Sequence, residues 1–121
     1  TMAHWGLPGY ALYSSTKGAI HRFADAYRAE LPSNGRLMMV YPIGTRTRFF
    51  EETKAPVVPP TQDVESVASA IVRGIERDAD AVYPSWVWKV TSFVDRFIPI
   101  IKPITQRLYR QALHDWDQDR I

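Results

Sequence analysis

Apolar residues recur at the spacing of an amphipathic helix in two stretches of the first 80 residues. The first stretch follows the turn signal Pro8-Gly9, and its apolar positions are Ile20, Phe23, Ala24, Tyr27 and Leu31. The second has apolar positions at Val64, Val67, Ala68, Ile71 and Ile75. We predict a helix over each stretch, the second capped by Thr61 with Asp63 in its first turn.

Two short apolar runs predict β-strands. The run 37–41 follows the tight-turn signal Asn34-Gly35, and the run 81–83 follows the second helix and stops at Pro84. The intervening segment 48–60 contains three prolines and predicts a loop. Helices that alternate with strands in this order are typical of an α/β fold with a mostly parallel sheet.

The last third of the chain predicts an amphipathic helical appendix over 85–121. Its apolar positions are Trp86, Val90, Phe93, Val94, Phe97 and Ile101. Positive charge on the other positions comes from Lys89, Arg96, Lys102, Arg107 and Arg110. Pro99 and Pro103 predict two breaks. No apolar run is long enough to span a bilayer. Two interpretations stay open: the appendix packs over a substrate cleft or a partner subunit, or it makes a peripheral contact in a membrane interface.

Composition narrows the function classes only slightly. The chain has 121 residues, a net charge of +2 and 45% hydrophobic residues, which implies no nucleic-acid partner. It contains no cysteine, which excludes disulfides and thiolate catalysis and favours a cytoplasmic location, with membrane association through the appendix as an addition. The three histidines lack the close spacing of a metal pair, so we expect no metal.

Tyr13 and Lys17 are the first candidates for chemistry. They lie four residues apart on the first predicted helix, which places a phenol and an ammonium on one face. Such a pair can serve as a general acid or base beside a cation. Because the spacing alone also arises by chance, its context matters. Pro8-Gly9 lies upstream, and the next predicted strand leads into the loop 42–47, PIGTRT.

Residues 8–47 resemble the active-site segment of the short-chain dehydrogenase/reductases, with the Tyr-x-x-x-Lys motif at Tyr13 and Lys17. The resemblance implies that Tyr13 exchanges a proton with the substrate oxygen, while Lys17 activates that phenol and holds the nicotinamide ribose. It also implies that the following loop packs along the nicotinamide of NAD or NADP, through Pro42, Ile43, Gly44, Thr45 and Thr47. The family usually has glycine directly after the proline, where this chain has Ile43.

The same resemblance implies a fold. Residues 1–84 would form the carboxy-terminal half of a Rossmann-type, doubly wound parallel sheet domain, and 85–121 its amphipathic helical extension. The family's catalytic serine would fall one position before Thr1, and the sequence contains no Gly-rich pyrophosphate turn. We therefore expect a longer protein, of which this stretch alone is inactive.

The expected function of the intact protein is hydride transfer between the nicotinamide cofactor and a carbonyl or hydroxyl group of an apolar substrate. Phe49 and Phe50 are candidates for the substrate wall, or they pack beneath the loop. The family often pairs the helix that carries the motif with a second copy, which implies a homo-oligomer. An epimerase or dehydratase with the same Tyr and Lys is an alternative enzyme. A non-catalytic membrane-binding or partner-binding module is the alternative from another class.

Overall fold

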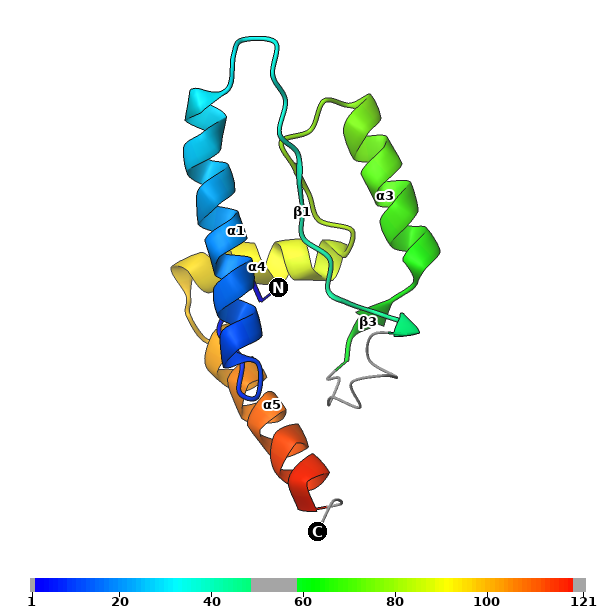
Figure 1. The fold of residues 1–121 in the computed structure, drawn as a ribbon. Coiled ribbons are helices and arrows are strands. Elements are labelled where there is room, and N and C mark those ends of the chain that lie inside the picture. Colours follow the sequence, from blue (N-terminus) through cyan, green and yellow to red (C-terminus); the bar gives the residue numbers. More distant parts are fainter. Residues whose placement is uncertain (1, 49–58, 119–121) are drawn as a thin grey trace.

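The structure is a computed structural model, and it describes residues 2–48 and 59–118. In these residues the chain is a mixture of helices and short parallel strand pairs (Figure 1). The helices are α1 (Ala11–Glu30), α3 (Val64–Glu76), α4 (Trp86–Phe97) and α5 (Ile101–Gln118). The strands are β1 (Met39–Val40), β2 (Gly44–Thr45), β3 (Thr61–Gln62) and β4 (Ala81–Val82). A mixed α/β class is therefore confirmed at this coarse level.

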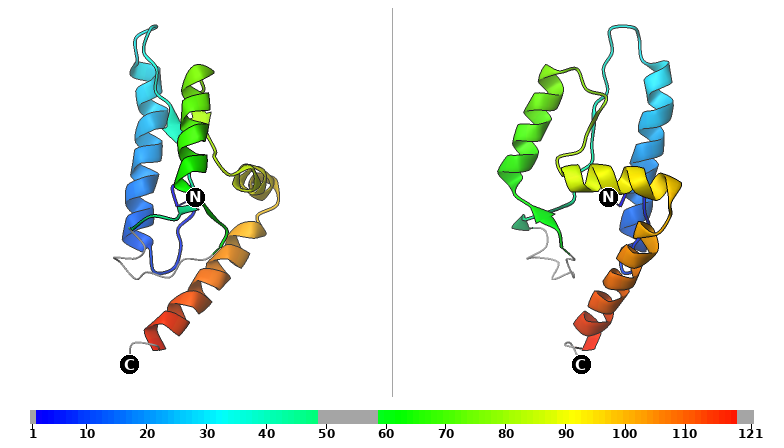
Figure 2. Two further views of the ribbon diagram at one scale, coloured as in Figure 1. Left: turned by 90° about the vertical axis from the view of Figure 1, so that its right-hand side faces the viewer. Right: turned by 180° about the vertical axis from the view of Figure 1, so that it is seen from behind.

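The strands form two parallel pairs. β1 pairs with β4, in a register that places Met39 opposite Ala81, and β2 pairs with β3. α1 and α3 flank the β1–β4 pair, α4 crosses near the end of these strands, and α5 leads away from the crossing (Figures 1 and 2). The β1–β4 pair is shorter than the predicted runs 37–41 and 81–83. Its inter-strand hydrogen bonds include those from Met39 N to Asp80 O and from Tyr41 N to Val82 O.

α1 begins and ends where the local sequence favours it. Gly9 has a φ of 78°, a left-handed conformation that suits glycine, and the turn it forms leads into the helix at Ala11. Leu31 has extended backbone angles because the following Pro32 disfavours a helical conformation. The predicted tight turn follows at once, closed by a bond of 2.7 Å from Gly35 N to Pro32 O.

α3 begins at Val64, so the predicted cap at Thr61 is wrong. Thr61 instead lies in β3, opposite Gly44, and Asp63 is the residue that precedes the helix. The helix ends in a Schellman turn: Ala79 N donates to Gly74 O, and Asp78 adopts a left-handed φ of 50°.

The packing face of α3 also differs from the predicted one. Ala70 and Gly74 are its buried residues, while Val64 and Ile75 are exposed. A small residue at position 74 lets the helix approach β4 closely, and this is why the most buried positions are not the most apolar ones.

The appendix contains one break, not two. α4 ends at Phe97, just before Pro99 as predicted, but Pro103 lies in the first turn of α5. A proline is tolerated there because the first amides of a helix have no partner within it. Asp95 supplies the missing acceptor, since its Oδ1 receives bonds of 2.9 and 3.0 Å from the amides of Ile101 and Lys102.

The described core joins the appendix to the first residues of the chain. Trp5 and Trp88 pack edge to face with ring centroids 4.4 Å apart, and both are buried. Gln106 Nε2 donates to Gly6 O at 2.8 Å. The other buried apolar residues are Leu7, Ala24, Tyr41, Ala70 and Val82. The appendix therefore packs against the amino-terminal segment of the chain.

Candidate functional site

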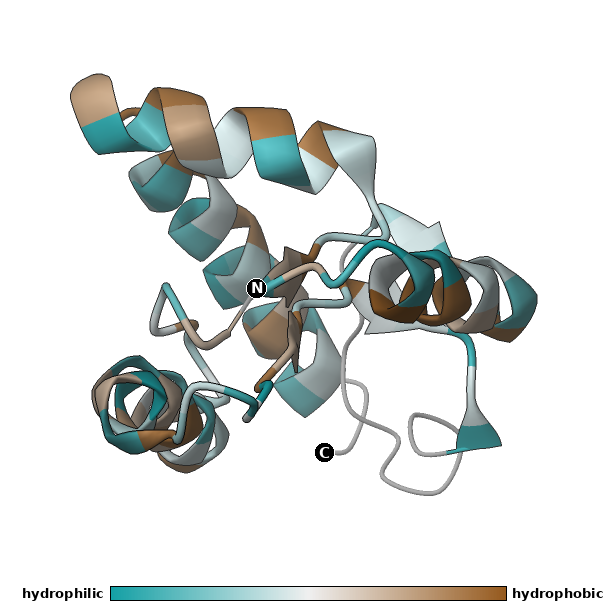
Figure 3. Ribbon diagram, turned by 90° about the horizontal axis from the view of Figure 1, so that it is seen from above, coloured by the Kyte–Doolittle hydropathy of each residue, from teal (hydrophilic) through white to brown (hydrophobic). Residues whose placement is uncertain are grey.

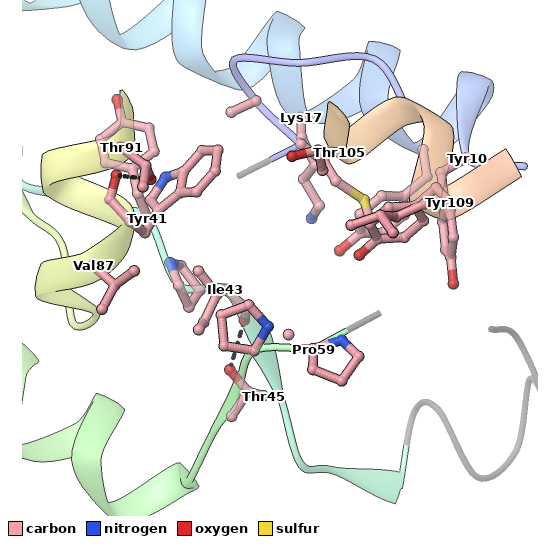
Figure 4. Close-up of a pocket in the computed structure, with 18 of the residues that line it drawn as sticks. Tyr10, Lys17, Tyr41, Ile43, Thr45, Pro59, Val87, Thr91, Thr105 and Tyr109 are labelled. Carbon is pink, nitrogen blue, oxygen red and sulfur yellow. Dashed lines mark hydrogen bonds between the residues drawn. The ribbon is translucent and has the colours of Figure 1, made fainter. Parts of the chain in front are cut away.

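A cavity of about 620 Å³ lies where α1, the segment after β1, α4 and α5 meet (Figure 4). Both candidate catalytic residues and the five candidate cofactor residues of the loop line it. They are Tyr13, Lys17, Pro42, Ile43, Gly44, Thr45 and Thr47. The fold thus gathers into one space residues that lie up to 34 positions apart in the sequence.

Tyr13 and Lys17 share one face of α1, one turn apart. Lys17 Nζ lies 5.0 Å from the centroid of the Tyr13 ring, which is within the range of a cation–π contact. Figure 4 shows Lys17 projecting from α1 into the space between the loop after β1 and α5. Tyr13 is 39% exposed, so a ligand in the cavity can reach its ring. The predicted proximity of a phenol and an ammonium is therefore present at the cavity wall.

The residue after Tyr13 anchors the start of α1. Ser14 is buried, and its hydroxyl lies 3.5 Å from the Leu7 amide as the acceptor. Thr16 Oγ1 donates a hydrogen bond of 2.7 Å to the carbonyl oxygen of Tyr13. Ser14 therefore holds the first turn of α1 against the preceding segment, while Thr16 bonds within the helix.

The loop after β1 is tied to the segment that starts α3. Arg46 N donates to Gln62 O at 3.0 Å, and the Arg46 guanidinium forms an ion pair with Asp63. Thr45 Oγ1 donates to Ile43 O at 3.1 Å and lies 3.4 Å from Gln62 Nε2. These contacts fix the backbone of the loop that forms one wall of the cavity.

The appendix supplies a further wall of the cavity. α4 contributes Val87, Trp88 and Thr91, and α5 contributes Ile101, Thr105, Leu108 and Tyr109. These residues recur at helical spacing, which is the one sequence signal that groups them. For the apolar stripe of α4, the sequence leaves open whether it packs on protein or contacts a membrane. In the structure that stripe is exposed, and the buried residue of α4 is Trp88.

Two phenols in the cavity wall are held in the neutral form. Burial raises the pKa of Tyr10, and the neighbouring Tyr109 and Tyr13 add to the effect. Burial likewise raises the pKa of Tyr41, with a further contribution from Tyr83, which stacks on it at 4.9 Å. Both side chains therefore act as hydrogen-bonding and apolar surfaces, without charge, over the physiological range.

A histidine pair lies beside the cavity, although its members are far apart in the sequence. The rings of His4 and His21 are 4.7 Å apart, and His21 Nδ1 is 2.7 Å from the Tyr41 hydroxyl. Burial lowers the pKa of His4 to about 4, with a smaller contribution from the charge of His21. His4 is thus a neutral packing residue near pH 7, and it does not line the cavity.

Phe49 and Phe50, the candidate substrate residues, lie outside the described residues. Within 2–48 and 59–118, no cluster of three or more His, Cys, Asp or Glu side chains could hold a metal ion. A search of the same ranges found no helix with the length and apolar character needed to cross a membrane.

The comparisons with known proteins give no relative. No family model, curated protein or solved structure matches the chain.

Proposed function

We propose that the intact protein is a nicotinamide-dependent oxidoreductase of the short-chain dehydrogenase/reductase type. The observation that carries the proposal is the shared cavity. The seven residues assigned by the motif resemblance all line it, with the Lys17 ammonium 5.0 Å from the Tyr13 ring. The described parallel strands and flanking helices are compatible with one half of a Rossmann-type domain.

The cavity residues fit the nicotinamide and ribose end of NAD or NADP. Lys17 brings three N–H donors that suit ribose hydroxyls, and the Thr47 hydroxyl suits the carboxamide. The remaining wall is largely apolar, as a planar nicotinamide ring requires. The cofactor, when bound, supplies or accepts the hydride.

The proposed chemistry assigns one proton to Tyr13. In the reducing direction its hydroxyl donates a proton to the substrate oxygen while the carbonyl carbon receives the hydride, which yields the alcohol. In the oxidising direction the phenolate takes that proton back. Lys17 orients the phenol through its position over the ring and offers the positive charge that stabilises a phenolate.

The proposed substrate is apolar. Val87, Ile101 and Leu108 from the appendix line the cavity. These side chains favour a hydrocarbon group over a sugar because they offer no hydrogen-bonding partner for its hydroxyls. The proposal leaves the choice between NAD and NADP open. It places the protein in the cytoplasm or at the surface of a membrane.

An oligomer is a further part of this proposal. Leu12, Ile20 and Phe23 on α1 are exposed, so an apolar face of the motif helix lies uncovered in the single chain. In an intact two-sided sheet domain, further elements or a second copy would cover such a face.

The test combines two substitutions with a matched control on the same helix. Tyr13→Phe should lower kcat by about 10²–10⁴-fold and leave the Kd for NADH or NADPH unchanged, because only the proton is lost. Lys17→Ala should weaken cofactor binding by about tenfold, as expected for one lost charged hydrogen-bond donor. Tyr27→Phe should change neither quantity, since Tyr27 is also 39% exposed but lies outside the cavity.

Cofactor fluorescence on the intact protein gives the Kd, and turnover of medium-chain ketones or alcohols gives kcat. Near-normal turnover by the Tyr13→Phe variant would contradict the assigned role. If a folded intact protein binds neither cofactor, the alternative of a non-catalytic binding module replaces the proposal. The exposed apolar face of α4 is the observation that favours that alternative.

A further inference from the structure

An apolar stripe on α4 is open to solvent along the whole helix. Its members are Trp86, Val90, Phe93 and Phe97, which we call the α4 stripe. They are 75%, 50%, 66% and 69% exposed, respectively. Helical spacing places them on one face, while the buried Trp88 lies on the other. Figure 3 shows α4 along one side of the molecule, away from α1 and α3.

The patch continues past the end of the helix. Ile98, Ile100 and Ile104 are each more than half exposed, in the linker and the first turn of α5. The rings of Phe93 and Phe97 pack edge to face 5.2 Å apart, so they present one joint aromatic surface. A contiguous apolar surface of this kind marks a contact site in a folded protein.

Basic side chains border this surface. Lys89 and Arg96 are exposed, and helical spacing places both on one flank of the α4 stripe. Lys102 follows at the start of α5 and is also exposed. The one acidic residue between positions 86 and 110 is Asp95, and its carboxylate turns away to cap α5 through the Ile101 and Lys102 amides. The surface thus has an apolar centre and a positive border.

We propose that the α4 stripe docks on the surface of an anionic phospholipid membrane. The aromatic and aliphatic side chains enter the boundary between headgroups and acyl chains, and the basic border meets the lipid phosphates and carboxylates. A second copy of the chain fits less well, because a symmetric contact would bring the two basic borders together. Docking does not depend on hydride transfer, so it stands or falls separately from the proposed enzymatic function.

The geometry gives docking a consequence for the cavity. Val87 and Thr91 of the same helix line the cavity, and Val87 is itself 41% exposed at its rim. A protein lying on its α4 stripe would hold the cavity beside the apolar phase of the membrane. An apolar ligand could then pass between lipid and cavity along α4.

The first experiment is sedimentation of the intact protein with vesicles. One set contains only phosphatidylcholine, and the other mixes phosphatidylcholine with phosphatidylserine. We expect tighter binding to the anionic set, with an affinity that falls as salt rises. The double substitution Phe93→Ser with Phe97→Ser should weaken binding at least about tenfold because it removes two inserted rings. Lys89→Gln with Arg96→Gln should weaken binding about tenfold or more on anionic vesicles only, since each basic residue adds attraction there.

Ile75→Ser is the matched control. Ile75 is 62% exposed, like the stripe phenylalanines, but it lies on α3. This variant should bind both vesicle sets as the unsubstituted protein does. Equal loss in the control and in the stripe variant would overturn the proposal, because the effect would then follow surface apolarity in general.

Tryptophan fluorescence supplies a readout from the stripe itself. Trp86 should shift to shorter wavelength on anionic vesicles and be quenched by lipids with brominated acyl chains, and Trp86→Phe should remove both changes. Trp5 and Trp88 are buried and report that the variants stay folded. The proposal is overturned if no vesicle binds at low salt. It is also overturned if the protein self-associates and does not bind lipid, and the same stripe substitutions convert it to a monomer.

Discussion

Gly74 of α3 lies so close to Val82 of β4 that no side chain fits between them. A Cβ at position 74 would overlap Val82 Cγ2 and lie 2.9 Å from Met38 Sδ. The helix therefore packs on the β1–β4 pair through its own backbone. This contact fixes the distance between α3 and the β1–β4 pair. It therefore also positions the loop that follows β1.

Gly74→Ala should lower the free energy of unfolding by about 1–3 kcal/mol, because the added methyl forces the helix away from the strand. Gly18→Ala is the control on α1. The nearest atom to its added methyl would be Ala3 O at 3.8 Å, an ordinary contact. The free energy of unfolding of that variant should rise by about 0.5–1 kcal/mol, since alanine is the better helix former. Urea unfolding of the intact protein measures both, and a shift of the same sign in both would contradict the packing argument.

Arg28 joins α1 to both strands of the β1–β4 pair. Its guanidinium donates to Leu37 O from Nε and Nη2, each at 3.3 Å, and Nη2 also donates to Asp80 O. These carbonyls lie just before the two strands begin. Asp80 O also accepts the inter-strand bond from Met39 N, so the guanidinium adds a second donor at the start of the ladder.

Arg28→Ala should lower the free energy of unfolding by about 1.5–3 kcal/mol, the usual contribution of a hydrogen bond from a charged group. Arg22→Ala should lower the free energy of unfolding by less than about 0.5 kcal/mol. Its contact with Asp25 is a surface ion pair, and the arginine side chain is 81% exposed. Hydrogen exchange locates the effect. The amides of Met39 and Tyr41 should exchange faster only in the Arg28 variant, and unchanged exchange there would show that the guanidinium does not support the strands.

The sequence predicted what local spacing determines. The helix that carries Tyr13 and Lys17, the turn at Gly35 and the approximate positions of β1 and β4 all follow from patterns within a few residues. The motif resemblance then assigned the loop residues that the structure brings to the same cavity. None of these steps required knowledge of how distant segments pack.

What the sequence missed depends on long-range packing. His4 and His21 meet because the amino-terminal segment folds back on α1. Their separation of 17 positions in the sequence does not predict this contact. On α4, two faces carry a tryptophan, and periodicity does not distinguish the one that packs on the rest of the chain. Trp88 is buried because Trp5 meets it, a contact across 83 positions that periodicity cannot reveal.

The His4 pKa predicts a pH dependence of stability. The folded-state pKa of His4 is about 4 and its ordinary value is 6.5, because burial and the charge of His21 disfavour the imidazolium. Arg22 acts in the same direction, and Asp25 opposes it. Between these two pH values the unfolded chain binds more protons than the folded one, so stability falls as the pH falls. The contribution is complete above pH 6.5 and lost as the pH approaches 4.

His4→Phe should therefore flatten the decline of stability between pH 6.5 and 4. The phenyl ring keeps the contacts with His21 and Tyr41 but cannot take up a proton. His114→Phe is the control, because His114 is exposed on α5 and its side chain contacts Asp115 and Gln118. Thermal unfolding of the intact protein across this pH window gives the slope. An unchanged slope in the His4 variant would show that other groups carry the acid sensitivity.

Val87 offers a test of which substrates the cavity admits. It lines the cavity from α4 and is 41% exposed, so a larger side chain there can extend over the cavity without displacing the core. Val87→Trp should narrow the space and reduce kcat/KM for a bulky apolar ketone about tenfold more than for a small one, the range that steric discrimination in a pocket reaches. The Kd for the nicotinamide cofactor should not change, because Val87 lies on the appendix wall and not beside Lys17.

Val72→Trp is the matched control, since Val72 is 54% exposed on α3 and does not line the cavity. Its kcat/KM for both ketones should equal that of the unsubstituted protein. An equal loss for the bulky and the small ketone in the Val87 variant would mean that α4 does not border the bound substrate. Turnover of the small ketone depends on the chemistry of Tyr13 and Lys17. If this turnover persists in the Val87 variant, the substitution has changed the shape of the cavity and not its catalytic residues. α4 would then set which substrates enter, while α1 and the loop after β1 carry out the reaction.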